Sequence, residues 1–485
     1  MWKPDRKNDS PLYMQIADYI EQQIISGEFP PGSLLPSERK LAEKLDVNRS
    51  TIVLAYSELR ALGLIESRPG SGTRVNSTKW GTIPKQSIQW DQYLQPANAV
   101  SPKGLQKRVR DALQQDASLI NLASGELNSD LSPIDEINQF MKIQKYQEML
   151  GYNDPLGSIK LRSAVANHLQ SENQIQTSNA SILITSGTQQ ALYLICHYLL
   201  SPGDTIAIED PSFYYSMPMF EDAGLRVFRM KLEQTDQQGE TSLSSDLHQA
   251  LKKNRVKMIF LNPNFQNPTG AVMSEDQKLD LLLLTNDLGI PIVEVDPFSL
   301  TAFQSKCPQP LKSSDSIGSV IYIGSLSKTV AAGLRIGWLV APRLIVEKLA
   351  EARQLIDYGQ SSLPQQVAAE FISSEHFQAH LGRLRLHLLY KRDLLIEALQ
   401  LHLSELVTFE IPEGGLHLWC ELHFKVSETK LLDEAIKQGV VFMPGSVFGK
   451  ETGHLRFTFA RPDTDKIAIG VQRFAKALHT VLQTP

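Results

Sequence analysis

The chain has 485 residues, of which 42% are hydrophobic and 21% are charged, as in water-soluble globular proteins; this length predicts two or three domains. A net charge of −5 excludes a general attraction to nucleic acid, so any contact with DNA must come from a local group of residues. The three cysteines form no CxxC pair, which excludes a disulfide framework. The polar N-terminus excludes a signal peptide, and the lack of a long apolar run excludes a membrane span. We therefore expect a cytoplasmic protein.

The first 75 residues are expected to form three short helices and two strands. Apolar residues recur at helical spacing, Gly27 and Gly63 provide helix ends, and Ser37 is a suitable N-cap. The three or four residues between the second and third helices are typical of a helix-turn-helix, and the Gly-rich turn over 69–72 predicts a β-wing. The predicted elements are helices over 11–26, 36–45 and 49–62 and strands over 64–68 and 73–75.

A helix-turn-helix directs the start of its second helix at DNA, which makes Arg49, Ser50 and Thr51 candidates for contacts with base edges and phosphates. Contacts with the DNA backbone or minor groove are expected from Arg39, Arg68 and Gly72. The alternative is a small helical cap with solvated arginines. Charge does not decide between them, because residues 1–75 contain ten basic and ten acidic side chains.

The order of these elements resembles the winged helix of GntR-type bacterial transcription regulators over its whole length. The resemblance implies a DNA-binding domain over residues 1–76 and a double-stranded DNA operator as partner. Residues 77–117 are polar, with scattered prolines and aromatics, and are interpreted as a linker that contains a helix over 104–114.

Residues 118–485 alternate between strand and helix patterns, which predicts an α/β domain with a mostly parallel central sheet. Functional side chains are expected in the loops that follow its strands. The predicted strands cover 181–185, 205–209, 258–261, 292–295 and 320–323.

Lys328 follows a predicted buried strand, where desolvation disfavours its ammonium form and lowers its pKa. A Schiff-base lysine needs such a lowered pKa. The hydroxyls of Ser325 and Ser327 and the guanidinium of Arg335 could converge on a phosphate. The alternative is a solvated loop lysine.

Four other loops carry candidate side chains. Gly187 and Thr188 open a helix directly after a strand, where free backbone N–H groups form an anion site. Phe213 could stack on a planar ring or simply belong to the core. Asn267 lies in a turn fixed by proline and glycine, and could be only a turn residue. Asp296 ends a strand and could bind a pyridinium nitrogen or cap a turn.

The order of these motifs resembles that of fold-type I pyridoxal-phosphate aminotransferases over most of residues 119–480. The resemblance implies that Lys328 forms the aldimine with pyridoxal phosphate (PLP), Asp296 binds the pyridine nitrogen, Asn267 contacts the ring hydroxyl and Phe213 stacks on the ring. It implies a phosphate site formed by Gly187, Thr188, Ser325, Ser327 and Arg335, with Tyr152 reaching in from a second subunit.

Residues 453–459 alternate as a strand, on which Arg456 matches the family's arginine for the substrate α-carboxylate; a structural arginine is the alternative. Phe298 and Ser299 lie where aminotransferases often place a tyrosine, so full transamination is not expected. His376 and His380 lie four residues apart on a predicted helix without an intervening glutamate, so we expect a solvated helix face and no metal site.

A winged helix followed by an aminotransferase-like domain resembles the MocR subfamily of GntR regulators. This implies a homodimeric transcription regulator that binds PLP through Lys328 and senses either the cofactor or an amino compound, which could be an amino-acid effector. Two alternatives stay open: an active aminotransferase whose fused head regulates its own expression, and a regulator that has lost the cofactor.

Overall fold

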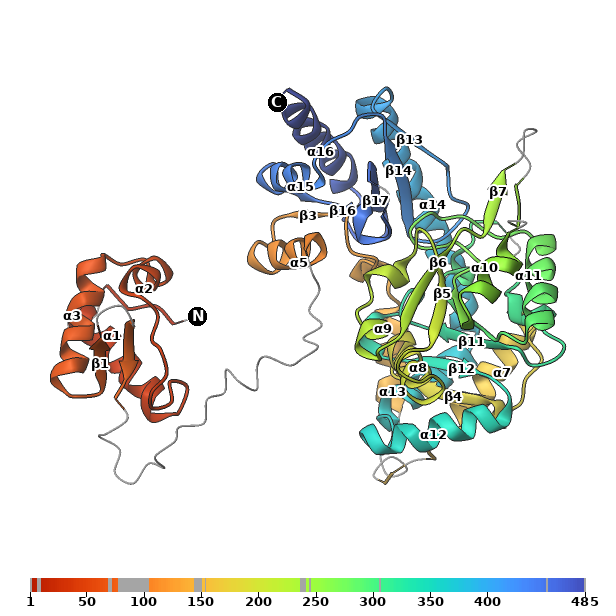
Figure 1. Cartoon of the computed structure of the whole chain (residues 1–485), viewed down its shortest axis with the longest axis horizontal. Coiled ribbons are helices and arrows are strands. Elements are labelled where there is room, and N and C mark those ends of the chain that lie inside the picture. The colour runs from red at the N-terminus through yellow and green to blue at the C-terminus, as the bar shows by residue number, and fades with distance from the viewer. Residues whose placement is uncertain are drawn as a thin grey trace. The chain divides into compact units, whose positions relative to one another are not determined.

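The computed structural model divides into two compact units, Met1–Ala99 and Val100–Pro485, which are described separately (Figure 1). The described residues are 2–6, 10–68, 72–76, 104–143, 151–152, 154–235, 241–243, 246–304, 307–450 and 452–483.

The first unit contains the three helices and two strands predicted for it. Ser37 caps α2 by accepting a hydrogen bond from the Lys40 amide, and the Asn48 side chain caps α3 by accepting from the Ser50 amide. Ile16, Ile52 and Tyr56 are fully buried between the helices. The elements are α1 (Leu12–Ile25), α2 (Glu38–Leu45), α3 (Arg49–Ala61), β1 (Ile65–Arg68) and β2 (Gly72–Val75).

The predicted wing is present as the antiparallel pair β1–β2, in which Ile65 pairs with Val75 and Arg68 with Gly72. Gly72 has a φ of +79°, and a Cβ there would lie 2.9 Å from Leu34 Cδ1, so both conformation and space favour glycine. The turn over 69–71 lies outside the described residues.

The second unit is built on a seven-stranded sheet in the order β4-β12-β11-β10-β9-β5-β6. Only β12 runs opposite to the other six strands, which confirms the mostly parallel sheet. Neither β6 nor β12 was predicted from the sequence. The strands are β4 (Ile182–Thr185), β5 (Thr205–Glu209), β6 (Arg226–Met230), β9 (Val256–Leu261), β10 (Ile292–Asp296), β11 (Val320–Ser325) and β12 (Gly337–Val340).

Both faces of this sheet are buried, because successive side chains of its strands enter different clusters. Leu183, Ile321 and Ile323 pack on the face covered by α8 and α12, whereas Ile182 and Tyr322 pack on the face covered by α7 and α13. The helices are α6 (Ile134–Ile143), α7 (Ile159–Asn173), α8 (Thr188–Tyr198), α9 (Met219–Asp222), α10 (Leu247–Lys253), α11 (Glu275–Leu288), α12 (Arg343–Asp357), α13 (Ser362–Ile372) and α14 (Glu375–Leu403).

A smaller sheet in the order β13-β14-β17-β16 packs with the last helices around a separate core. Figure 1 shows these strands beside α15 and α16, apart from the seven-stranded sheet. The other strands are β3 (Ile120–Asn121), β7 (Glu233–Thr235), β8 (Thr241–Leu243), β13 (Val407–Phe409), β14 (His417–Leu422), β15 (Val440–Val441), β16 (Met443–Pro444) and β17 (His454–Thr458), and the last two helices are α15 (Glu428–Lys437) and α16 (Lys466–Gln483).

The helix predicted within the linker is present as α5 (Leu105–Gln115), and it packs as part of the second unit. Val109 is buried in the core of the smaller sheet, and Arg108 forms an ion pair with Asp433 of α15. The preceding residues, 77–103, lie outside the described part of the chain.

The prediction for the histidine pair on α14 was wrong for one member. His376 is exposed, but His380 is buried, and its Nε2 lies 2.6 Å from the Thr329 carbonyl oxygen. Because α14 packs on the loop after β11, one side chain of the pair points inward, which helical spacing alone does not show.

The three cysteines are free and buried. Within the described residues, no helix is long and apolar enough to cross a membrane.

Candidate functional site

Lys328 lies in the loop that follows β11, as predicted, and its side chain is largely buried. Its Nζ donates a hydrogen bond of 2.5 Å to the Gly125 carbonyl oxygen. Burial lowers the pKa of Lys328 to about 8; Glu126 acts to raise it, and Arg456 and Arg335 lower it further. The solvated-lysine alternative is therefore wrong, because the amine is desolvated and close to two other cations.

The five residues of the predicted phosphate site come from two loops that meet at the ends of β4 and β11. Arg335 Nη2 donates to the Ser186 carbonyl oxygen at 2.6 Å, and a Cβ on Gly187 would lie 2.7 Å from this nitrogen. Ser325 Oγ donates to Ser327 Oγ at 3.0 Å. Gly187 immediately precedes α8, so the backbone N–H groups at the start of this helix face the same loops.

Asp296 ends β10 and is paired with Gly324 of β11, which brings it close to the Lys328 loop. Its Oδ1 accepts hydrogen bonds from the Ser299 amide at 3.0 Å and the Ser299 hydroxyl at 2.6 Å, so it does cap the following turn. Its Oδ2 accepts from the Tyr322 hydroxyl at 3.1 Å. Burial raises the pKa of Asp296, and these donors oppose the increase. The capping role and a cofactor role are compatible, since they use different oxygen atoms.

Asn267 and Arg456 are brought together from the two sheets. Arg456 Nη1 donates to Asn267 Oδ1 at 2.8 Å, and its Nη2 donates to the Ala123 carbonyl oxygen at 2.5 Å. The guanidinium lies 4.8 Å from the centre of the Phe448 ring, and Arg456 as a whole is 4% exposed. Burial lowers the pKa of Arg456 to about 9, and its Nε has no hydrogen-bond partner among the residues that the structure describes.

Phe213 is not a core residue, because 37% of it is exposed. Its amide donates to the Asn267 carbonyl oxygen at 2.9 Å, which places it beside the same loop. Tyr152 is 91% exposed, and its ring lies 5.9 Å from that of Tyr358, away from the contacts described above. The structure therefore does not bring Tyr152 together with the other predicted site residues of its own chain.

Three residues that the structure places at the site were given no binding role in the sequence prediction. Tyr322 and Ser299 bind Asp296, and His417 lies beside Gly125. Because β11 pairs with β10, a tyrosine three residues before the Ser325–Lys328 loop was a usable signal for Tyr322. No phenol follows Asp296 at the expected spacing, but one reaches it from the neighbouring strand.

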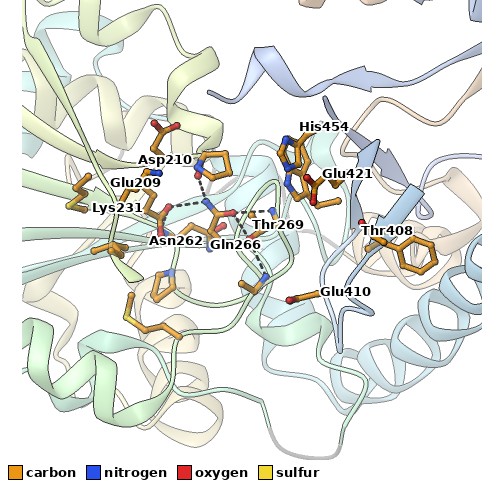
Figure 2. A pocket seen from close by; sticks show the side chains of 18 residues that line it. Glu209, Asp210, Lys231, Asn262, Gln266, Thr269, Thr408, Glu410, Glu421 and His454 are labelled. Carbon is orange, nitrogen blue, oxygen red and sulfur yellow. Dashed lines mark hydrogen bonds between the residues drawn. The ribbon is translucent and has the colours of Figure 1, made fainter. Parts of the chain in front are cut away.

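A cleft of about 650 Å³ lies next to the Asn267 loop, between the ends of β5, β6 and β9 and the smaller sheet (Figure 2). Figure 2 shows Gln266 at its centre, where Gln266 Nε2 donates to the Pro211 carbonyl oxygen at 2.7 Å and to Glu209 Oε2 at 3.3 Å. None of the predicted site residues is among the residues described as lining this cleft. The cleft is therefore next to the predicted site, but the residues expected to bind the cofactor do not line it.

In the first unit, four of the six predicted DNA-contact residues, Arg39, Arg49, Ser50 and Thr51, lie at the starts of α2 and α3. Arg49 Nη2 lies 3.0 Å from Glu38 Oε2, and Arg39 Nε lies 3.5 Å from Glu43 Oε1. Both arginines are exposed, as is Ser50, whereas Thr51 is half-buried. The candidates on the wing are Arg68, which ends β1, and Gly72, which starts β2.

Comparisons with known proteins assign both parts of the chain to known families. Residues 12–75 match the family model "Bacterial regulatory proteins, gntR family", and residues 117–474 match "Aminotransferase class I and II". The chain is 36% identical over 464 residues to the uncharacterized HTH-type transcriptional regulator YdfD of Bacillus subtilis (strain 168), covering 95% of each chain. It is 31% identical over 445 residues to the HTH-type transcriptional regulator NorG of Staphylococcus aureus (strain USA300), covering 89% of this chain and 96% of NorG.

The second unit is also similar to a solved enzyme, the kynurenine aminotransferase of Pyrococcus horikoshii in complex with PMP. The TM-score is 0.74 with 29% identity, and the match covers 81% of this chain and 99% of the enzyme. Pyridoxal phosphate is the cofactor of this domain. The buried Lys328 amine and the Gly187 backbone next to Arg335 fit such a group, since they offer a nucleophile and an anion site. The chain belongs to the MocR-type GntR regulators, transcription regulators in which a winged helix-turn-helix precedes an aminotransferase class I and II domain.

Proposed function

We propose that the second unit is a sensor that binds pyridoxal phosphate covalently through Lys328 and reports an amino-acid effector to the DNA-binding unit. The observation that carries the proposal is the buried Lys328 amine, with its pKa lowered to about 8, in a loop that also faces an anion site. The cofactor supplies an electrophilic carbon for the amine of a ligand when it is bound.

The residues that would hold the cofactor are those of the sequence prediction. Asp296 would accept a hydrogen bond from the protonated ring nitrogen, Asn267 would contact the ring hydroxyl and Phe213 would cover the ring. Gly187, Thr188, Ser325, Ser327 and Arg335 would bind the phosphate. Support comes from the contacts that already join these loops and from the buried Asp296 carboxylate, which can offer Oδ2 to the ring.

The effector would be an amino acid, because Arg456 is a buried cation that can bind a carboxylate and Lys328 can yield to an incoming amine. The protein would act as a cytoplasmic homodimer, with the exposed Tyr152 reaching the site of the partner subunit. An effector can change DNA binding only through different affinities for two arrangements of the protein. Moving the population from 1:99 to 99:1 needs a difference of roughly 5.5 kcal/mol.

An active aminotransferase is the second candidate, favoured by the retention of Lys328, Asp296 and Arg456 in one site and by the similarity to a solved aminotransferase. The two candidates differ in turnover. The purified protein would be incubated with pairs of amino and keto acids, and its affinity for co-purified DNA fragments would be measured with and without each amino acid. Multiple turnover without an effect on DNA affinity would contradict the sensor.

Arg49→Ala is expected to weaken operator binding by about 1–3 kcal/mol and to change the preferred base at one position, because a base contact is lost. The variant also frees Glu38 from its ion pair. Selection of bound sequences from a random DNA pool measures both effects. An unchanged sequence preference in the variant would exclude a base contact by Arg49.

Arg39→Ala is expected to lower affinity for all DNA sequences and to reduce the salt slope by about one unit, because a phosphate contact is lost. Arg343→Ala is the matched control, since Arg343 is also exposed and also pairs with a glutamate four residues later, but in the second unit. Mobility shifts between low and moderate salt measure the slope. Equal behaviour of the two variants would contradict the phosphate contact.

The rate of covalent cofactor capture is expected to rise with pH, to reach half its maximum near pH 8 and to level off above about pH 9. Only the neutral amine of Lys328 can react, and with a pKa of about 8 about a tenth of the molecules carry it at pH 7. A lysine with its ordinary pKa of 10.5 would show a rate that still increases above pH 9. Stopped-flow absorbance after mixing apoprotein with cofactor distinguishes the two profiles.

A further inference from the structure

His417 is a buried side chain at the site to which neither the sequence nor the proposed function assigns a role. It is the first residue of β14, it is 3% exposed, and neither ring nitrogen has a hydrogen-bond partner within the described chain. Buried polar groups in folded proteins are nearly always hydrogen-bonded, because an unsatisfied donor or acceptor loses its contact with water. A buried imidazole with two free nitrogens is therefore expected to have a partner that the chain itself does not supply.

The residues around His417 show that its side chain lies close to Lys328 and Arg456, the two cations of the site. A Cβ on Gly125 would lie 2.8 Å from His417 Cε1 and 2.9 Å from His417 Nε2. Gly125 is the residue whose carbonyl oxygen accepts the hydrogen bond from Lys328. The Phe298 ring meets the imidazole edge to face, with centroids 5.9 Å apart, so the ring is held in place without any polar contact.

Strand pairing brings His417 close to Arg456 as well. His417 is paired with Thr458 and Trp419 with Arg456 in the antiparallel pair β14–β17, so His417 and Arg456 are diagonal neighbours on one face of the sheet. Diagonal neighbours lie about 7–8 Å apart, within reach of long side chains. Burial, followed by the charges of Arg456 and Lys328, lowers the pKa of His417 well below its ordinary value, so the ring is neutral and carries one N–H and one lone pair.

Two hydrogen-bond donors on this face of the sheet lack an acceptor in the part of the chain that the structure describes. Arg456 Nε is a buried donor without a partner, and the described residues include no carboxylate that pairs with Arg456. The His417 N–H is a second free donor close by. A single carboxylate can accept from both.

We propose that His417 is a ligand-binding residue that, together with Arg456, binds the carboxylate of the effector and makes the site select amino acids over the corresponding amines. This inference rests on the proposed amino-acid sensor and adds to it the group that discriminates between the two ligand classes. An amine without a carboxylate would leave both buried donors without an acceptor, so the site would bind it much more weakly than the amino acid.

The test is a spectral titration of the cofactor-loaded full-length protein with each of the twenty L-amino acids. The most effective amino acid is then compared with its decarboxylated amine. His417→Phe keeps an aromatic ring and removes the N–H; we expect affinity for the amino acid to fall about tenfold or more, with little change for the amine. His417→Gln keeps a donor near the position of Nε2 and should recover part of the affinity.

His454→Phe is the matched control, because His454 lies on β17 of the same sheet and stacks on Trp419 outside the site. It should bind amino acid and amine like the wild type. Equal losses for both ligands in His417→Phe, or no loss at all, would overturn the role of His417 and leave the sensor in place. A wild-type protein that binds the cofactor but responds to no amino acid would overturn both, and the fault would then lie with the proposed function.

Discussion

Lys328→Ala abolishes the covalent cofactor linkage and its absorbance while the protein stays folded; this is the largest effect we expect from any single substitution. The lysine amine is the only group of the loop that can form the linkage, whereas the phosphate site and the cores do not depend on it. Removing a buried amine also removes a desolvated charge, which limits the cost to stability. Absorbance of the purified variant, with size-exclusion chromatography and circular dichroism, measures these outcomes.

Lys391→Ala is the matched control for this experiment. Lys391 is also buried and its pKa is also lowered by burial, but it lies on α14 and donates to the Ala460 carbonyl oxygen at 3.3 Å. Per folded molecule, this variant should keep the full cofactor absorbance. A linkage that borohydride still reduces in Lys328→Ala would assign the covalent bond to another lysine.

The second large effect is expected from Arg456→Ala, which should leave cofactor binding nearly intact and remove the response to an amino-acid effector. Arg456 contacts Asn267 and Ala123 and has no direct link to the phosphate site. Loss of a charged hydrogen-bond partner should weaken amino-acid binding by about 10- to 100-fold or more. Spectral titration with amino acids, wild type against variant, measures the change.

Arg335→Ala is expected to have the opposite effects to Arg456→Ala: weaker cofactor binding, with the response to the amino acid retained once the cofactor is bound. Arg335 lies against Ser186 and Gly187, so its loss should weaken cofactor binding through the phosphate, and saturating cofactor should restore the response to the amino acid. If Arg456→Ala and the wild type respond equally, Arg456 does not bind the effector. If DNA binding by the wild type responds to pyridoxal phosphate and to no amino acid, the protein senses the cofactor itself.

Which class of regulator the chain belongs to depends little on tertiary contacts. The helix-turn-helix, the wing and the α/β pattern are local: each follows from apolar periodicity, caps and turn residues within about 20 positions. Ser37 and Asn48 cap their helices, as side chains of their type do wherever a helix starts next to them. The order of the loop motifs around Lys328 and Asp296 is equally a property of the sequence, because these residues directly follow or end buried strands.

The partners of the polar side chains were decided only by the fold. Arg456 and Asn267 are 189 residues apart, and Lys328 and Gly125 are 203 apart, so no local pattern could pair them. The burial of His380 and His417 depends on which neighbours pack against them, and residue type does not determine that for histidine. Sequence therefore determined which residues follow the strands. The positions of the two sheets relative to each other determined which of these residues meet, because hydrogen bonds between distant segments form only once both sheets are in place.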